Sequence, residues 1–324
     1  DIALKISTLS KGDRGYALIG SQEYVPVKAM RLILRRNMTV ERAFQEIVRN
    51  CLEQIQSNVP GVALQYDQES LHQMRVGLRR LRSAFRLFKD VIALPSELQQ
   101  EIDWLSKQMG GARDWDVLSC STLTMIMQSV SDETQLSELH LAVMARAKEE
   151  HKTASTAVNS ARYTRFMLCI TRWLLGREWT EVRHQCNPSP KEMGVMDFTR
   201  KLLAHGGQRL LKLGRKFDAM STNDRHHVRI AAKKMRYTTE FFQSLFSEKK
   251  VQPYTEALTN LQNELGWFND VAIADSLLKE LQGTRANLQE SIGFVRGYMA
   301  SNVICNNRNM CKLWKKFTTV NYPN

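Results

Sequence analysis

A basic helical segment that occurs twice constrains this chain more than any other feature. The first copy, Leu71–Lys89, reads LHQMRVGLRRLRSAFRLFK, and the second, His226–Gln243, reads HHVRIAAKKMRYTTEFFQ. The alignment pairs His72 with His226, Arg75 with Arg229, Arg79 with Lys233, Arg80 with Lys234 and Arg82 with Arg236. Because the histidine and the cations persist while most other letters change, the repeat predicts an internal duplication whose charge serves a purpose.

The repeat continues beyond these two segments. LSKQMGGARDWDV, residues 105–117, aligns with LQNELGWFNDVA, residues 261–272, so that Gly110 pairs with Gly266 and Asp114 with Asp270. From about residue 31 onward, apolar residues recur with helical period. We therefore predict an all-α fold of two four-helix bundles related by pseudo-twofold symmetry, forming one domain with a basic central groove.

The predicted boundaries follow from this periodicity. We expect an extended segment at 1–30, a first bundle at 31–190, a second bundle at 191–318 and a tail at 319–324. The predicted helices are 39–57, 68–92, 97–109, 113–130, 134–158, 162–180, 193–219, 223–247, 251–267, 269–282 and 286–318. The last of these is expected to break near Ser301–Asn307, and the alternation Ile2–Ile6 predicts a strand or an extended tail.

Charge and cysteine content narrow the class of protein. The chain has 46 Lys and Arg against 33 Asp and Glu, a net charge of +13, which favours a polyanionic partner: nucleic acid, an anionic membrane or polyphosphate. Its six cysteines form no CxxC pair, which is typical of reduced thiols in a cytosol. Its longest apolar run is too short to span a bilayer, so we expect a cytoplasmic protein without membrane insertion.

The first basic segment carries two adjacent stripes when it is drawn as a helix. Leucines, Met74 and two phenylalanines form an apolar face, and the adjoining stripe holds His72, Arg75, Arg79, Arg82, Arg86 and Lys89. A solvated face with i,i+4 ion pairs is the ordinary interpretation of such a stripe. No Asp or Glu lies between Leu71 and Lys89, however, so the cations repel one another, which favours a binding stripe. In the second copy, Glu240 replaces Arg86 and shortens the row.

Further basic rows occur on other predicted helices. They comprise Arg35, Arg42 and Arg49 in the first half, Lys201, His205, Arg209, Lys212 and Lys216 at the start of the second half, and Arg308, Lys312 and Lys315 near the C-terminus. Each row alone is more typical of a solvated face. Together they predict that both bundles turn cations toward one groove. Arginine forks and rigid rows of cations suit a ligand whose negative charge repeats along its length, such as polyphosphate.

Catalytic and metal-binding interpretations are weaker. His72 and His226 have no HxxxH or HxxE partner on their own helices, so we expect them to cap a helix or to donate to phosphate. Asp114 and Asp116 lie on different sides of a helix and cannot jointly hold one metal there. The sequence has no P-loop, GxGxxG, HExxH or GxSxG motif. We therefore expect no catalytic residue, no metal and no cofactor in this chain.

The two copies and the Gly-x-x-Arg/Asn-Asp elements at Gly110–Asp114 and Gly266–Asp270 resemble the CHAD family, the conserved histidine α-helical domain. That resemblance covers roughly residues 31–318. It implies two four-helix halves and a non-catalytic module that binds inorganic polyphosphate and is targeted to polyphosphate granules. It also implies phosphate contacts from His72, Arg75, Arg79, Arg80 and Arg82, and from His226, Arg229, Lys233, Lys234 and Arg236. Whether His226 or His227 faces the groove stays open.

The resemblance has a second implication, because CHAD domains are often fused behind a CYTH triphosphatase domain. Residues 1–25 look like the end of such a domain, although the chain has no ExExK strand and should not itself hydrolyse triphosphate. The leading hypothesis is thus a polyphosphate binder. The alternatives are a binder of nucleic acid or of polyanions in general, an accessory domain of a triphosphatase, and a phosphohydrolase. We further expect Arg75→Ala with Arg229→Ala to weaken binding with little loss of stability.

Overall fold

The chain is all-α. A computed structural model describes residues 25–65, 67–130, 134–177 and 193–323, and within these ranges the regular structure is helical and contains no strand. The predicted fold class is therefore confirmed. The alternation Ile2–Ile6 and the segment that resembles the end of a CYTH domain lie outside the described residues.

The contacts divide the chain into two compact units. Unit 1 comprises residues 1–32, 39–113 and 146–193, and unit 2 comprises residues 33–38, 114–145 and 194–324. Residues 114–145 thus group with unit 2, although they precede the predicted bundle boundary near residue 190. Each unit is described below by itself, and the predicted domain boundaries stay predictions.

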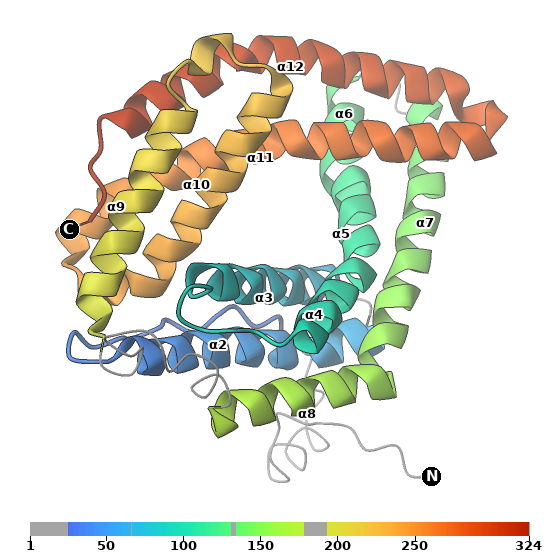
Figure 1. The fold of residues 1–324 in the computed structure, drawn as a ribbon. Coiled ribbons are helices and arrows are strands. Elements are labelled where there is room, and N and C mark those ends of the chain that lie inside the picture. The colour runs from blue at the N-terminus through green and yellow to red at the C-terminus, as the bar shows by residue number, and fades with distance from the viewer. Residues whose placement is uncertain (1–24, 66, 131–133, 178–192, 324) are drawn as a thin grey trace. The chain divides into compact units, whose positions relative to one another are not determined.

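Unit 1 is built on a hairpin of α2 (Val40–Ser57) and α3 (Gln68–Leu87), to which α4 (Ser96–Gln108) and α8 (Ala161–Gly176) are added (Figure 1). The hydroxyl of Thr39 caps α2, and the carboxylate of Asp67 accepts from the backbone N–H groups of Glu69 and Ser70 at the start of α3. The two helices approach closely at Gly77, where a Cβ would lie only 2.8 Å from Cγ1 of Ile55. This close packing fixes the outward face of α3.

An aromatic cluster holds α3 from within unit 1. The ring of Phe44 on α2 lies 5.8 Å from Phe85, 5.1 Å from Phe88 and 6.1 Å from Trp173 of α8, measured between centroids. All four side chains are buried. The apolar stripe predicted for this segment therefore faces the core, as its periodicity indicates.

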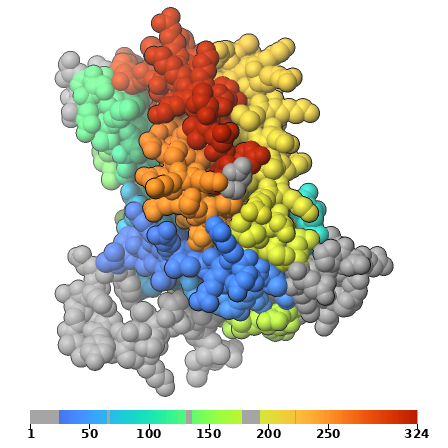
Figure 2. Space-filling model, turned by 90° about the vertical axis from the view of Figure 1, so that its left-hand side faces the viewer, coloured from blue at the N-terminus to red at the C-terminus, as the bar shows by residue number. Residues whose placement is uncertain are grey.

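Unit 2 contains four successive helices, each packed on the next: α9 (Val195–Leu213), α10 (Thr222–Phe242), α11 (Glu248–Thr284) and α12 (Gln289–Thr318) (Figure 1). Trp314 of α12 stacks on Phe217 at 4.9 Å and lies so close to Gly214 that a Cβ there would be 1.9 Å from the indole. Figure 2 shows this side of unit 2, where α12 lies beside α9. The same unit includes the second half of α5 (Gly110–Val117), η2 (Leu118–Leu123), α6 (Thr124–Ser129) and the start of α7 (Thr134–Val158).

Two predictions about helix ends are wrong. The segments predicted as separate helices at 251–267 and 269–282 form the single helix α11, and α12 runs through the predicted break at Ser301–Asn307. Gly266 lies inside α11, and its φ is not positive, so it does not form the left-handed turn that often ends a helix. The polar residues of α12 are tolerated because buried Met299 and Met310 anchor the helix on both sides of them.

Candidate functional site

The cationic cluster of unit 1 forms around His72 near the start of α3. Its imidazole is half-buried, and its pKa is lowered by burial, by the charge of Arg113 on α5, and by Arg79 and Arg75 of its own helix. The carboxylate of Glu69 raises the pKa of His72; its effect is smaller than that of Arg113 and larger than that of Arg79 or Arg75. Three arginines therefore lie within electrostatic range of one histidine, and the cluster is strongly positive before any ligand binds.

Arg75 attaches this cluster to the end of α4. Its Nη1 donates to the carbonyl oxygen of Met109 at 2.9 Å, where α4 ends, so a cation occupies the negative end of the helix dipole. The same nitrogen lies 3.4 Å from the position that a Cβ on Gly110 would take. Removing Arg75 thus removes a helix cap. The expectation that Arg75→Ala costs little stability no longer holds.

Arg80 has a different position from its neighbours. It is 2 % exposed, and its guanidinium donates to Oε1 of Gln54 at 3.0 Å and to Oδ1 of Asn50 at 2.8 Å, both on α2. These bonds satisfy a charge inside the unit rather than presenting it to a ligand. We therefore leave Arg80 out of the proposed contact set, although the family resemblance implied it.

The row on α3 also meets an acid from another helix. Arg82 forms a short ion pair with Asp103 of α4, and this bond, together with one from Gln99, lowers the pKa of the Asp103 carboxyl. Although α3 carries no acid between Leu71 and Lys89, one cation of its row, Arg82, is therefore paired with an acid from another helix. Arg86 and Lys89, at the end of the row, are exposed.

In unit 2, the equivalent residues of α10 border a pocket. His226 and Arg229 line it together with Asn269 of α11, whereas His227 is not among the lining residues. Both histidines are exposed, and their rings lie 6.4 Å apart. Asn269 occupies the position that Arg113 holds in the first Gly-x-x-Arg/Asn-Asp element. The two copies of the motif thus bring a histidine near this element in each unit.

The remaining predicted contacts of α10 are more varied. Lys233 is half-buried and Lys234 is exposed. The guanidinium of Arg236 lies 5.0 Å from the ring centroid of the buried Tyr237, within cation–π range. Arg236 therefore has a local structural partner, and its availability to a ligand is lower than the sequence pattern indicates.

The two basic rows of the second half lie on solvated surfaces of unit 2. The exposed members are Lys201, His205, Arg209, Lys212, Lys216, Arg308, Lys312 and Lys315, the last of which pairs with Asp218. Within the part of the chain that the structure describes, these residues are accessible to solvent, but no contact places one row against another. The groove shared by both bundles stays a prediction.

Sequence reasoning missed two basic residues, Arg113 and Arg225. Arg113 stands inside the Gly-x-x-Arg-Asp element, and Arg225 directly precedes His226, so both had a local signal. Arg225 lies over the ring of Phe217 at 5.7 Å and lines the same pocket as His226. The charge of Arg113 acts on His72, and Arg225 lines the same pocket as His226, so neither residue is identified by membership of a heptad row.

Two further classes of site have no support in the described part of the chain. No group of three or more His, Cys, Asp or Glu side chains there is arranged to hold a metal ion. Nor does any described helix combine the length and apolarity that crossing a bilayer requires.

Comparison with protein families and solved structures identifies relatives of this chain that share its all-α fold. The family model described as "CHAD domain" matches residues 46–279. The crystal structure of the CHAD domain from the plant Ricinus communis is 35% identical, with a TM-score of 0.84, and covers 93% of this chain and 99% of that one. PptA from Streptomyces chartreusis, at 12% identity and a TM-score of 0.59 over 87% of this chain and 99% of its own, shares the fold. No curated protein sequence matches. The family match and the similarity to the Ricinus domain together show that this chain belongs to the CHAD domain family.

Proposed function

We propose that this chain binds inorganic polyphosphate, without a chemical reaction, through the cationic faces of α3 and α10. The observation that carries the proposal is the cluster of His72, Arg75, Arg79 and Arg113, gathered from two helices of unit 1. Like charges at this spacing repel, and a row of phosphates would convert the repulsion into attraction. Membership of the CHAD family supports the same ligand class.

The contacts of Arg79 favour an anionic ligand. Its Nε is buried and has no hydrogen-bond partner within the described residues. Buried polar atoms in proteins are nearly always satisfied by protein, water or ligand. A phosphate oxygen is a suitable acceptor, because charge-assisted bonds to guanidinium are short and strong.

Nucleic acid is the main competing ligand, since it also carries a repeating phosphate charge. Proteins that bind single strands generally stack bases on accessible aromatic side chains. Trp115, Trp173 and Trp314 are all buried here and serve the cores of their units. The phenylalanine and tyrosine side chains that α3 and α10 themselves carry are buried as well: Phe85, Tyr237, Phe241 and Phe242. These two helices therefore place no phenylalanine, tyrosine or tryptophan ring of their own on their cationic faces, which favours a ligand that has no bases.

The first test is a titration with long-chain polyphosphate, competed by triphosphate and by duplex DNA. We expect polyphosphate to bind tightly and DNA to displace it poorly. We also expect log K to fall steeply with log salt, because several neutralised phosphates release their counterions. Affinity unchanged across a salt series, or equal displacement by DNA, would reduce the function to general polyanion binding. Phosphate release in the presence of Mg²⁺ or Mn²⁺ would contradict the proposal that the chain binds polyphosphate without hydrolysing it.

Binding should also depend on pH through His72. Its pKa is lowered in the free protein by burial and by Arg113, so the unfolded chain protonates first and the free energy of unfolding falls as pH drops through about 6.5. A bound polyanion reverses the local field and raises this pKa, so binding takes up a proton. We expect affinity to rise by about threefold to tenfold from pH 8 to pH 6.

The control for this prediction is His72→Asn, which keeps a hydrogen-bonding side chain but cannot titrate. Isothermal calorimetry in two buffers of different ionisation enthalpy would measure the proton uptake directly. Terminal phosphates of polyphosphate also titrate, but they contribute equally to both proteins. An unchanged pH dependence in His72→Asn would remove His72 from the site.

Such binding would determine where the protein lies in the cell. A protein with this module should accumulate at cytoplasmic polyphosphate granules. Fluorescence imaging of the tagged protein, with and without the granules, would test this expectation.

A further inference from the structure

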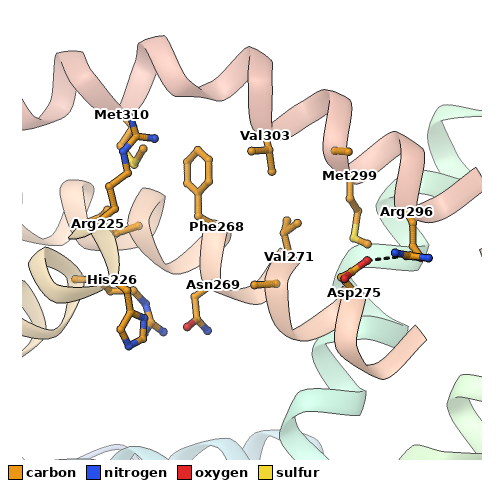
Figure 3. A pocket seen from close by; sticks show the side chains of 14 residues that line it. Arg225, His226, Phe268, Asn269, Val271, Asp275, Arg296, Met299, Val303 and Met310 are labelled. Carbon is orange, nitrogen blue, oxygen red and sulfur yellow. Dashed lines mark hydrogen bonds and ion pairs between the residues drawn. The ribbon is translucent and has the colours of Figure 1, made fainter. Parts of the chain in front are cut away.

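Unit 2 contains a pocket whose lining does not suit polyphosphate alone. It is a cavity of about 330 Å³ enclosed by α10, α11 and α12, as Figure 3 shows. Apolar side chains make up most of its wall: Leu265, Phe268, Val271, Ala272, Met299, Ala300, Val303 and Met310. A purely ionic ligand gains nothing from such a wall, because burying charge against apolar groups is unfavourable.

The polar groups of this pocket lie at two separate places. Arg225, His226 and Arg229 come from α10. In Figure 3, Arg225 extends toward Met310, whereas His226 extends the opposite way and lies beside Asn269. Away from them, Asp275 pairs with Arg296 at 2.6 Å and with Lys279 at 2.7 Å. The carboxylate of the pocket is therefore already neutralised, whereas the α10 end is basic.

Arg225 adds positive charge to the α10 side of the pocket, although its side chain extends toward Met310 and not toward His226. Its Nε is buried and makes no hydrogen bond within the described residues. Asn269 stands beside His226 in Figure 3 and adds an amide that can both donate and accept. A phosphate group at this end could use a guanidinium, an imidazole and an amide together.

From this asymmetry we infer that the pocket binds an organic phosphate monoester, with its phosphate on His226, Arg229 and Asn269 and its apolar body against Phe268, Val303 and Met299. The cavity volume lies in the usual range for small-molecule sites, and a mostly apolar wall with a few convergent polar groups is their usual composition. The phosphate end shares residues with the α10 face, so the inference rests in part on the proposed function.

An aromatic body fits the wall better than a flexible chain. Phe268 projects into the middle of the cavity in Figure 3, where an aromatic ring could pack against it, and the sulfur atoms of Met299 and Met310 interact favourably with aromatic rings. Aryl phosphates and nucleoside monophosphates share this chemistry. We therefore use 1-naphthyl phosphate as the primary probe, with AMP, decyl phosphate and inorganic phosphate for comparison.

The discriminating variants lie next to each other on α12. Val303 lines the pocket, whereas Ile304 is 77 % exposed, so Val303→Trp fills the cavity and Ile304→Trp places the same side chain in solvent. We expect Val303→Trp to weaken binding of 1-naphthyl phosphate at least about tenfold and Ile304→Trp to leave it unchanged. Both should bind long-chain polyphosphate as the parent protein does. Ala300→Phe, at an exposed position of the lining, fills the mouth if Val303→Trp does not fold.

The outcomes separate this inference from the polyphosphate proposal. Organic phosphate binding that Val303→Trp or Ala300→Phe abolishes supports the pocket, and the preferred probe then identifies an aryl, nucleoside or alkyl body. Binding of all three esters no tighter than that of inorganic phosphate overturns the inference, even if polyphosphate binds. Equal binding by the filled and unfilled variants also overturns it. Organic phosphate binding without polyphosphate binding would support the pocket and contradict the proposed function.

Discussion

Arg80→Ala should lower the free energy of unfolding by about 3 kcal/mol, measured by urea denaturation. The substitution leaves the amide oxygens of Asn50 and Gln54 buried without the donor that they now share, and it opens a cavity between α2 and α3. Each lost bond to a charged group costs about 1.5–3 kcal/mol, and incomplete relaxation of the cavity adds to that cost. A loss below about 1 kcal/mol would show that the buried guanidinium is not a structural element.

The neighbouring residue provides the matched control. Arg79 is half-buried on the same helix, its Nε has no hydrogen-bond partner within the described residues, and its charge, like that of Arg113, lowers the pKa of His72. Arg79→Ala should therefore leave the free energy of unfolding within about 0.5 kcal/mol of the parent value. If the two alanine variants were equally destabilised, the division between structural and binding arginines on α3 would be wrong.

Arg79→Gln combined with Arg113→Gln should weaken binding of long-chain polyphosphate by about 100-fold. Each arginine is expected to contribute one charge-assisted hydrogen bond of about 1.5 kcal/mol, and 1.4 kcal/mol corresponds to a tenfold change in affinity. Glutamine keeps the length and polarity of the side chains while removing the charge. The measurement is a titration at fixed salt, and the slope of log K against log salt should decrease as well.

The corresponding control removes the same charge elsewhere in unit 1. Lys148→Gln with Lys152→Gln changes two exposed cations of α7, neither of which belongs to a predicted row. We expect a loss of no more than about threefold from this pair, because exposed charges are screened by salt. Equal losses in both double variants would mean that binding reads net charge and not the cluster around His72.

Most of the fold could be predicted because helical periodicity is a local signal. The apolar stripe of α3 faces the aromatic cluster as its spacing predicts, and the start of α10 follows its Ser221 cap. The continuity of α11 could not be predicted, since Gly266 resembles a helix end when its surroundings are unknown. Only the packing of α11 along α12 shows that the glycine lies within one helix.

The sequence predicts the kind of chemistry at the candidate site, but it does not predict which residues belong to the site. The helical spacing leaves Arg80 off the stripe that holds Arg79, but it does not reveal that the Arg80 guanidinium is 2 % exposed and bound inside the unit, whereas Arg79 is half-buried. Arg113 was missed for a different reason. It lies on another helix, and its approach to His72 depends on tertiary structure. The affinities of both faces remain predictions.

The difference between Arg113 and Asn269 has an evolutionary consequence. A duplication within one gene gives a protein two versions of the same element under a single promoter, so one version can drift while the other preserves the ancestral property. In the first version the position beside the histidine holds a full positive charge; in the second it holds a short neutral amide that borders a cavity. If the two proposed ligands bind as inferred above, a single chain has gained a second ligand while its first copy kept the original one.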